Sequence, residues 1–373
     1  MSEMLETPGQ AYTLSRVDLQ MLFDLLIQRG YEIVGPRVDQ GSIVYDRIDC
    51  VADLPIGYTD EQSAGQYRLR TTDEQECFGY NVGPHSWKKY LYPPLLSLMR
   101  SKKSDQGLQI ERIQEKEKRF AFVGVRACEI AAMRIQDRVL MSDSHMDHLY
   151  AQRRTDALII AVNCTQAAST CFCTSMKTGP QCKSGFDLAL TEIVDGFVLE
   201  VGSEQGEEIV QQLQLEKASS QMERQAQQRR ERAVAQISRA MPSGDLRNKL
   251  MSNLNHPHWQ DVASRCLSCA NCTMVCPTCF CSSVEEVSDL TADEVVRQRR
   301  WDSCFNVDFS HTSGAPIRDS IRSRYRQWLT HKLATWIDQF DSSGCVGCGR
   351  CITWCPVGID LTKEVATICG ESV

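Results

Sequence analysis

The sequence lacks the common signatures of nucleotide binding and of substrate chemistry. No Gly-x-Gly-x-x-Gly follows a predicted strand, and neither a Walker loop nor a Cys-x-x-Cys-His haem site is present. The 7 histidines are scattered, without the spacing of a His-Glu-x-x-His zinc site. We therefore expect no flavin or nucleotide on this chain, and we assign no catalytic residue to it.

Long apolar runs and an excess of positive charge are also missing. The longest hydrophobic stretches, such as residues 157–162, are far too short to span a membrane, and the first residues do not read as a signal peptide. The formal net charge of -7, from 41 basic and 48 acidic residues, disfavours nucleic acid as the main partner. We expect a cytoplasmic protein with no membrane or nucleic-acid partner, in which the 19 cysteines are kept reduced and some of their thiolates bind metal.

Cysteine is abundant and occurs in a repeated pattern. Two runs, at residues 266–277 and 345–356, each read Cys-x2-Cys-x2-Cys-x3-Cys-Pro, which is the pattern of two-cluster bacterial ferredoxins. Three thiolates two residues apart wrap a loop around one face of a cubane, whereas the fourth leads into the next helix and points to the other cluster. A zinc site usually needs only two Cys-x2-4-Cys pairs, so the double run favours clusters over zinc or disulfides.

This exchange of the fourth ligand predicts which cysteines share a cluster. The first [4Fe–4S] cluster is expected on Cys266, Cys269, Cys272 and Cys355. The second is expected on Cys345, Cys348, Cys351 and Cys276. Glycines lie between the cysteines of the second run but not of the first, and a backbone without Cβ can crowd a cluster. We therefore expect the two clusters to differ in potential.

The first half of the chain predicts an α/β domain with a parallel-containing sheet. Residues 119–125 read as a strand, those up to about 140 as an amphipathic helix, and residues 157–162 as a second strand. This order pairs the two strands in parallel through a right-handed crossover. The other expected elements are helices at 14–29, at 187–192 and after 201, strands at 31–35, 41–45 and 196–201, and an irregular stretch at 52–94.

Further cysteines follow the ends of these two strands. Carboxyl ends of parallel strands are where open α/β sheets place their ligands. We predict a third cluster, with the ligands Cys128, Cys164, Cys171 and Cys173. Cys182 in place of Cys128 is the alternative ligand, and a redox disulfide or a zinc site is the alternative use of these thiols.

The chain divides into three predicted parts. Residues 1–215 form the α/β domain with the third cluster site, residues 216–256 a solvated helical linker, and residues 257–373 a mostly α-helical, bacterial-ferredoxin-like dicluster module. A long insert, residues 277–344, separates its two cysteine runs. Within the insert, Thr278-Cys-Phe-Cys281 repeats the letters of Thr170-Cys-Phe-Cys173. We expect packing or supporting roles for Cys279, Cys281 and Cys304, and a helix at 322–336 that buries a Trp/Leu stripe.

Several of these motifs together resemble the sulfhydrogenase beta-subunit family, whose close relative is the electron-transfer subunit of anaerobic sulfite reductase. The motifs are the two cysteine runs and residues 125–130, 163–164, 170–173 and 185–190. Ala127 and Glu129 depart from the Pro and Asp that we expect in the family. The resemblance implies a cytosolic complex in which this protein relays electrons between a flavin- and NAD(P)-binding partner and a catalytic partner.

We therefore predict a non-catalytic iron–sulfur electron-transfer subunit with two [4Fe–4S] clusters and a third in the α/β domain. The resemblance implies a nickel–iron hydrogenase as the catalytic side. The corresponding component of anaerobic sulfite reductase, with a sirohaem partner, is the alternative. A free-standing ferredoxin-like carrier or redox-sensing module is an alternative of another class, and an enzyme with a substrate-active cluster on Cys279, Cys281 and Cys304 is a third.

Overall fold

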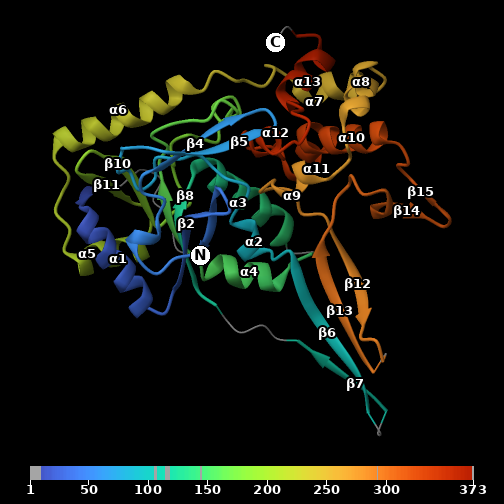
Figure 1. Ribbon diagram of the computed structural model, residues 1–373, viewed down its shortest axis with the longest axis horizontal. Coiled ribbons are helices and arrows are strands. Elements are labelled where there is room, and N and C mark those ends of the chain that lie inside the picture. Colours follow the sequence, from blue (N-terminus) through green and yellow to red (C-terminus); the bar gives the residue numbers. More distant parts are fainter. Residues whose placement is uncertain (1–9, 105–106, 114–117, 143–144, 292, 372–373) are drawn as a thin grey trace.

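A mixed seven-stranded sheet forms the centre of the first half of the chain (Figure 1). The computed structural model describes residues 10–104, 107–113, 118–142, 145–291 and 293–371. The strand order is β1-β11-β10-β9-β8-β2-β3. Strands β10, β9, β8 and β2 are parallel to one another, β11 and β3 pair antiparallel with β10 and β2, and β1 pairs antiparallel with β11. The strands are β1 (Ala11–Leu14), β2 (Glu32–Asp39), β3 (Ser42–Arg47), β8 (Phe120–Val125), β9 (Leu158–Val162), β10 (Leu188–Ile193) and β11 (Gly196–Val201).

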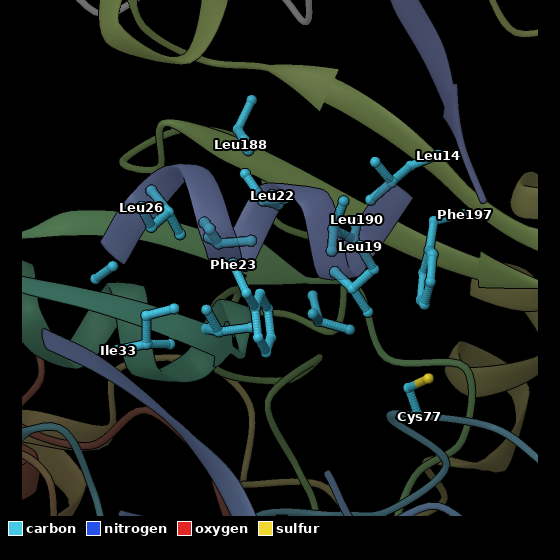
Figure 2. Packing of buried hydrophobic residues seen from close by; sticks show 14 of the residues in the cluster. Leu14, Leu19, Leu22, Phe23, Leu26, Ile33, Cys77, Leu188, Leu190 and Phe197 are labelled. Atoms are coloured by element: carbon cyan, nitrogen blue, oxygen red, sulfur yellow. The ribbon is translucent and has the colours of Figure 1, made fainter. Parts of the chain in front are cut away.

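Helices cover both faces of this sheet. On one face, α1 (Arg16–Gln28) buries Leu22 and Phe23 in the same cluster as Leu190 of β10 (Figure 2). On the other face, α3 (Ala127–Leu140) and α4 (His148–Thr155) form a second cluster with the opposite sides of β8 and β9. The inner strands β8 and β9 are therefore buried along their whole length, as in parallel sheets covered on both faces. This confirms the predicted strand–helix–strand unit that presents Cys128 and Cys164.

Two local predictions in this half are wrong. Residues 187–192, expected as a helix, form β10, because Leu188 and Leu190 pack on one face of the sheet while Ala189 packs on the other. A short apolar run cannot be assigned from periodicity alone. The stretch expected to be irregular contains a hairpin and two helical turns, which are β4 (Tyr58–Ser63), β5 (Gln66–Thr71), the 3-10 turn Val51–Asp53 and α2 (Lys88–Leu91).

A second sheet joins the first half of the chain to the insert. It is antiparallel, has the order β12-β13-β6-β7, and projects from the body as a long arm (Figure 1). Its strands are β6 (Leu95–Ser104), β7 (Gly107–Arg112), β12 (Ser282–Ser288) and β13 (Glu294–Trp301). The expectation of a mostly helical module missed these strands. Because β13 of the insert pairs with β6, the insert is built into the α/β half.

Helices around one core form most of the remaining chain. They are α7 (Leu246–Ser252), α8 (His258–Arg265), α9 (Asn271–Met274), α10 (Ile321–Thr330), the π-helical turn His331–Thr335, α11 (Trp336–Phe340), α12 (Arg350–Thr353) and α13 (Leu361–Cys369), with a small hairpin β14 (His311–Thr312) and β15 (Ala315–Pro316). The predicted helix at 322–336 is present, and its Trp328, Leu329 and Trp336 are buried. No helix in the described part of the chain is long and apolar enough to cross a membrane.

Two further helices close the large sheet. They are α5 (Glu204–Leu213) and α6 (Ser220–Gln236). The second was expected as a solvated linker, and most of its side chains are exposed. Its Ala226 and Ala233 are fully buried, however, and Ala226 packs against Ile193 and Val198 of the sheet. The segment is therefore part of the α/β layer rather than a free connection.

Candidate metal centres

The first cysteine run meets the end of the second run at a cavity beside α9. The cavity contains about 460 Å³ of space that no atom occupies. The cysteines that line it are Cys266, Cys269, Cys272, Cys351 and Cys355. Aromatic and aliphatic side chains, including Phe305, Trp328 and Leu361, complete its walls. All four predicted ligands of the first cluster therefore face one cavity, and the donor set of four thiols in an apolar pocket fits an iron–sulfur cluster.

Electrostatics also group these thiols. Burial raises the pKa of Cys272 well above its ordinary value, and the nearby thiols of Cys266, Cys355 and Cys269 raise it further. Backbone N–H groups donate to two of the sulfurs. The Ser268 nitrogen lies 3.3 Å from Cys266 Sγ, and the Ile359 nitrogen lies 3.3 Å from Cys355 Sγ. Such N–H donors favour the thiolate, and hydrogen bonds to sulfur also tune a cluster's potential.

Both cysteine runs adopt the same unusual backbone. Ser268 and Ala270 have positive φ values of 52° and 64°, and Gly347 and Gly349, at the equivalent positions of the second run, have 66° and 77°. In each run the residue two after the first cysteine donates its N–H to that cysteine's sulfur. The left-handed positions curl each loop so that three thiols face inward. The first run achieves this with residues that carry a steric penalty there, which its letters alone do not indicate.

The second group of thiols lies next to the first. Burial raises the pKa of Cys351 well above its ordinary value, and the nearby thiols of Cys345, Cys348 and Cys276 raise it further. Cys276 comes from the end of the first run, so the structure brings together the four predicted ligands of the second cluster. Cys272 also acts on Cys351, which places the two groups side by side.

A buried ammonium group touches this second site. The Nζ of Lys332 lies 3.3 Å from Cys276 Sγ, and the lysine is only 3% exposed. A hydrogen bond from Cys279 lowers the pKa of Cys276 well below its ordinary value, and the Lys332 charge lowers it further. The lysine lies in the π-helical turn, a distortion often found at functional sites. Sequence reasoning missed this residue, because nothing local distinguishes one lysine of a basic helix.

The predicted third site lies against the second run. Cys128 is in the first turn of α3, and Cys164 follows β9. Burial raises the pKa of Cys173 above its ordinary value, and the nearby thiols of Cys164, Cys171 and Cys348 raise it further. Burial likewise raises the pKa of Cys128, and the neighbouring side chains of Cys348, Glu129 and Cys173 raise it further. The structure therefore gathers the four preferred thiols at the carboxyl end of the sheet, next to the second group.

Hydrogen bonds fasten the third site to the second. Phe172 N–H donates to the carbonyl of Gly347 at 2.9 Å, and Thr178 Oγ1 donates to the carbonyl of Val346 at 2.6 Å. A Cβ on Gly347 would lie 2.7 Å from the Phe172 carbonyl, and one on Gly349 would lie 2.4 Å from the Thr170 carbonyl. These two glycines therefore permit close approach of the third-site loop, in addition to the turn itself.

Cys182, the alternative ligand, belongs to a different environment. Its side chain packs in the core cluster beneath α3 with Ile130, whereas Cys128 and Cys173 share a separate cluster with Cys348. Its N–H donates to Asn163 Oδ1 at 2.7 Å. The Cys182 thiol still lies near Cys164. Burial raises the pKa of Cys182, and the neighbouring Cys164 thiol raises it further. The packing favours Cys128 over Cys182 as the fourth member of the group.

A buried ion pair holds the α/β half and the second run in register. Arg350 of that run and Glu129 of α3 form a salt bridge in which the two side chains are 0% and 1% exposed. Glu129 also accepts hydrogen bonds from Tyr45 Oη at 2.9 Å and from Trp87 Nε1 at 3.0 Å. The only sequence signal for this network was the Arg-x-Cys-Glu motif, which includes Glu129 but not its partner.

The remaining cysteines of the insert also gather near the second site. The Cys279 thiol lies beside that of Cys276, and the Cys281 thiol lies beside that of Cys304. They were expected only to pack or to support a cluster. Among the described residues, no group of three or more His, Cys, Asp and Glu side chains lies close enough to hold a single metal ion. The eight ferredoxin-type cysteines do not do so either, because sulfurs around a cubane are further apart than those around one ion.

Comparisons with known proteins agree with this architecture. A family model described as a 4Fe-4S dicluster domain matches residues 265–359, which include both cysteine runs and the insert. The beta subunit of sulfhydrogenase 2 from Pyrococcus furiosus is 30% identical over 286 residues, covering 74% of this chain and 83% of that protein. No solved structure matches the chain at a significant level. The chain belongs to the family of sulfhydrogenase beta subunits.

Proposed function

We propose that this chain relays electrons through iron–sulfur clusters, from or to a flavin- and NAD(P)-binding partner on one side and the catalytic components of a nickel–iron hydrogenase on the other. The 4Fe-4S dicluster domain and the relation to a sulfhydrogenase beta subunit support an iron–sulfur electron-transfer role in a multisubunit assembly. The flavin and nickel–iron partners are the proposed part. The clusters would supply the one-electron steps, and the protein holds them at fixed spacing and screens them from water.

We assign three clusters to the thiol groups described above. The first uses Cys266, Cys269, Cys272 and Cys355. The second uses Cys345, Cys348, Cys351 and Cys276. The third uses Cys128, Cys164, Cys171 and Cys173. The carrying observation is that these groups adjoin one another in series: Cys272 lies near Cys351, and Cys348 lies near Cys128 and Cys173. A continuous series of redox sites is what a relay requires.

Among the described residues, the first site has the most exposed of the assigned ligands. Cys269 is exposed, and two apolar neighbours, Leu267 and Val357, are 61% and 40% exposed. We take this face as the point where a partner exchanges electrons with the relay. Leu267→Glu should slow electron transfer between the subunits several-fold and leave the iron content unchanged. Leu290→Glu, at an exposed position in the turn between β12 and β13, is the matched control. Equal rates for the two variants would refute the assignment of this face.

Anaerobic purification of the native complex through a tag on this chain tests the partners. Nickel and flavin should co-purify, and the three clusters should contribute about twelve irons per chain to the total. Addition of NAD(P)H should reduce clusters of this chain in the complex but not in the isolated chain. Sirohaem without nickel would move the assignment to sulfite reduction, and the chain alone on the column would favour a free-standing carrier.

A further inference from the structure

Three cysteines outside the assigned clusters come together at the base of the arm. Cys279 and Cys281 precede β12, and Cys304 follows β13, so the pairing of these two strands brings the thiols together. The thiols of Cys281 and Cys304 lie beside each other, and Cys279 lies near Cys281. The N–H of Asp302 donates to the Cys281 carbonyl at 2.9 Å, which fixes the two segments at this point. All three thiols are only partly exposed.

Two buried lysines lie beside these thiols. Lys88 is 6% exposed, and its Nζ donates to the Cys279 carbonyl at 2.9 Å and lies 3.9 Å from the centre of the Trp301 ring. Lys332, at 3% exposure, donates to Thr278 Oγ1 at 3.0 Å. Among the described residues, the strongest electrostatic interactions that favour the charged form of either lysine come from cysteine thiols. No carboxylate in the described part of the chain forms an ion pair with Lys88 or Lys332.

Buried ammonium groups require negative charge nearby. An unpaired buried cation costs several kcal/mol. Lys332 already faces Cys276 of the second site, so Lys88 is the buried cation that indicates a further anionic centre. Neutral thiols would not supply that charge. A Cys281–Cys304 disulfide would remove two potential thiolates and leave Lys88 with only Cys279 and Cys276 as neighbouring potential anions among the described residues. Thiolates bound to a metal cluster would keep their negative charge in place.

The local sequence repeats at the third site. Both Thr-Cys-Phe-Cys segments pack at the second cysteine run. Thr278 Oγ1 donates to the carbonyl of Gly344, directly before the run, at 2.6 Å, and the hydroxyls of Thr170 and Thr353 lie 2.9 Å apart. In both segments the phenylalanine faces protein; Phe172 is fully buried, and Phe280 packs edge-on against Trp336. The second run is therefore flanked by two similar cysteine loops, only one of which has been assigned a cluster.

We propose that Cys279, Cys281 and Cys304 bind a further iron–sulfur cluster, with Lys88 and Lys332 balancing its charge. Soft thiolate ligands without histidine or carboxylate favour such a centre. Cys276 is already assigned to the second cluster, so this centre has three protein thiolates. The fourth iron of a cubane there takes a ligand from outside this set, which distinguishes the site from the ferredoxin-type clusters.

Iron analysis of the intact complex tests the proposal. Iron and acid-labile sulfide in the anaerobically purified complex should reach about sixteen of each per chain, rather than about twelve, after subtraction of the partners' clusters. The triple variant Cys279→Ser, Cys281→Ser, Cys304→Ser should lose about four of each and keep the EPR signals of the other clusters. Cys50→Ser with Cys369→Ser, two cysteines outside every group, is the matched control and should lose none.

Three results would overturn the proposal. They are an unchanged iron content in the triple variant, zinc lost in place of iron, and a Cys281–Cys304 disulfide found by peptide mapping of the anaerobic protein. If the triple variant does not fold, Cys304→Ser alone and the iron count of the unmodified complex decide the question. The proposal does not depend on which partners are present, since the iron on this chain is counted whether or not nickel and flavin co-purify.

Discussion

Replacement of Lys332 by methionine should lower the reduction potential of the second cluster. The ammonium group is buried and lies 3.3 Å from Cys276 Sγ, a proposed ligand of that cluster. A fixed positive charge stabilises the reduced, more negative state, so its removal makes reduction less favourable. Methionine fills a similar volume, and the Thr278 hydroxyl keeps its own hydrogen bond to the Gly344 carbonyl, so no buried partner loses every contact.

The size of the effect follows from Coulomb's law. An added electron spreads over the metal core, so the charge separation is about twice the 3.3 Å contact, roughly 6.5 Å. With an effective dielectric constant of about 20, the interaction is about 2.5 kcal/mol. For a one-electron step this corresponds to a shift of roughly 100 mV, because about 59 mV accompanies each tenfold change in equilibrium.

An EPR-monitored redox titration of the anaerobic complex measures this shift. The Lys332→Met variant should show the second cluster with a potential about 100 mV more negative; the further cluster proposed beside Lys332 should shift in the same direction, and the first and third clusters should change far less. Lys332→Arg keeps the charge and should shift the potential much less. Lys363→Met, at an exposed position of α13, controls for a general loss of charge. A shift of the second cluster below about 20 mV, or one toward positive values, would refute the electrostatic reasoning.

Three further predictions concern stability and the packing of the sites. Gly347→Ala adds a Cβ 2.7 Å from a neighbouring carbonyl at a residue with left-handed backbone, so it should lower the melting temperature and release iron of the third site. The control is Gly30→Ala, where φ is 81° and nothing lies near the added Cβ, so that this variant has the backbone strain without the clash. Equal iron loss in both variants would contradict this explanation. Glu129→Gln removes the charge opposite the fully buried Arg350 and should cost about 3–5 kcal/mol in urea unfolding, whereas a loss under about 1 kcal/mol would show that the pair is not desolvated. Burial raises the pKa of Glu192 to about 7 from 4.5, so the folded state holds this proton more tightly than the unfolded chain, and stability should fall as the pH rises from about 4.5 to 7. In melting curves across this range, Glu192→Gln should flatten that decline; an identical slope in both proteins would exclude Glu192 as its source.

Local spacing made the ferredoxin-type groups readable in the sequence. Cysteines two residues apart must lie in one tight loop, whatever the rest of the chain does, so both cysteine runs could be recognised from their spacing. The strand–helix–strand unit was equally readable, because the short continuous apolar run of β8 is followed directly by the longer amphipathic pattern of α3. The segment at β10 was misassigned because its six residues carry no period that distinguishes a helix from a strand.

Contacts between distant segments left no such local signal. The pairing of β6 with β13 joins residues about two hundred positions apart, and neither strand's sequence names its partner. The same applies to Arg350, whose carboxylate partner Glu129 lies in another half of the chain. Whether Cys128 or Cys182 joins the third group also depended on packing, because each of them comes after one of the two neighbouring parallel strands, β8 and β9.

The sequence by itself thus determined the chemistry: thiols in cluster-binding runs, and an α/β sheet that presents further cysteines. Only the tertiary structure decided how these parts are connected. It placed the thiol groups in series, put Lys332 against Cys276, and gathered Cys279, Cys281 and Cys304 beside Lys88. The physical reason is that ligand spacing is a property of a few neighbouring residues, whereas charge compensation and the spacing of redox sites arise only when distant segments pack together.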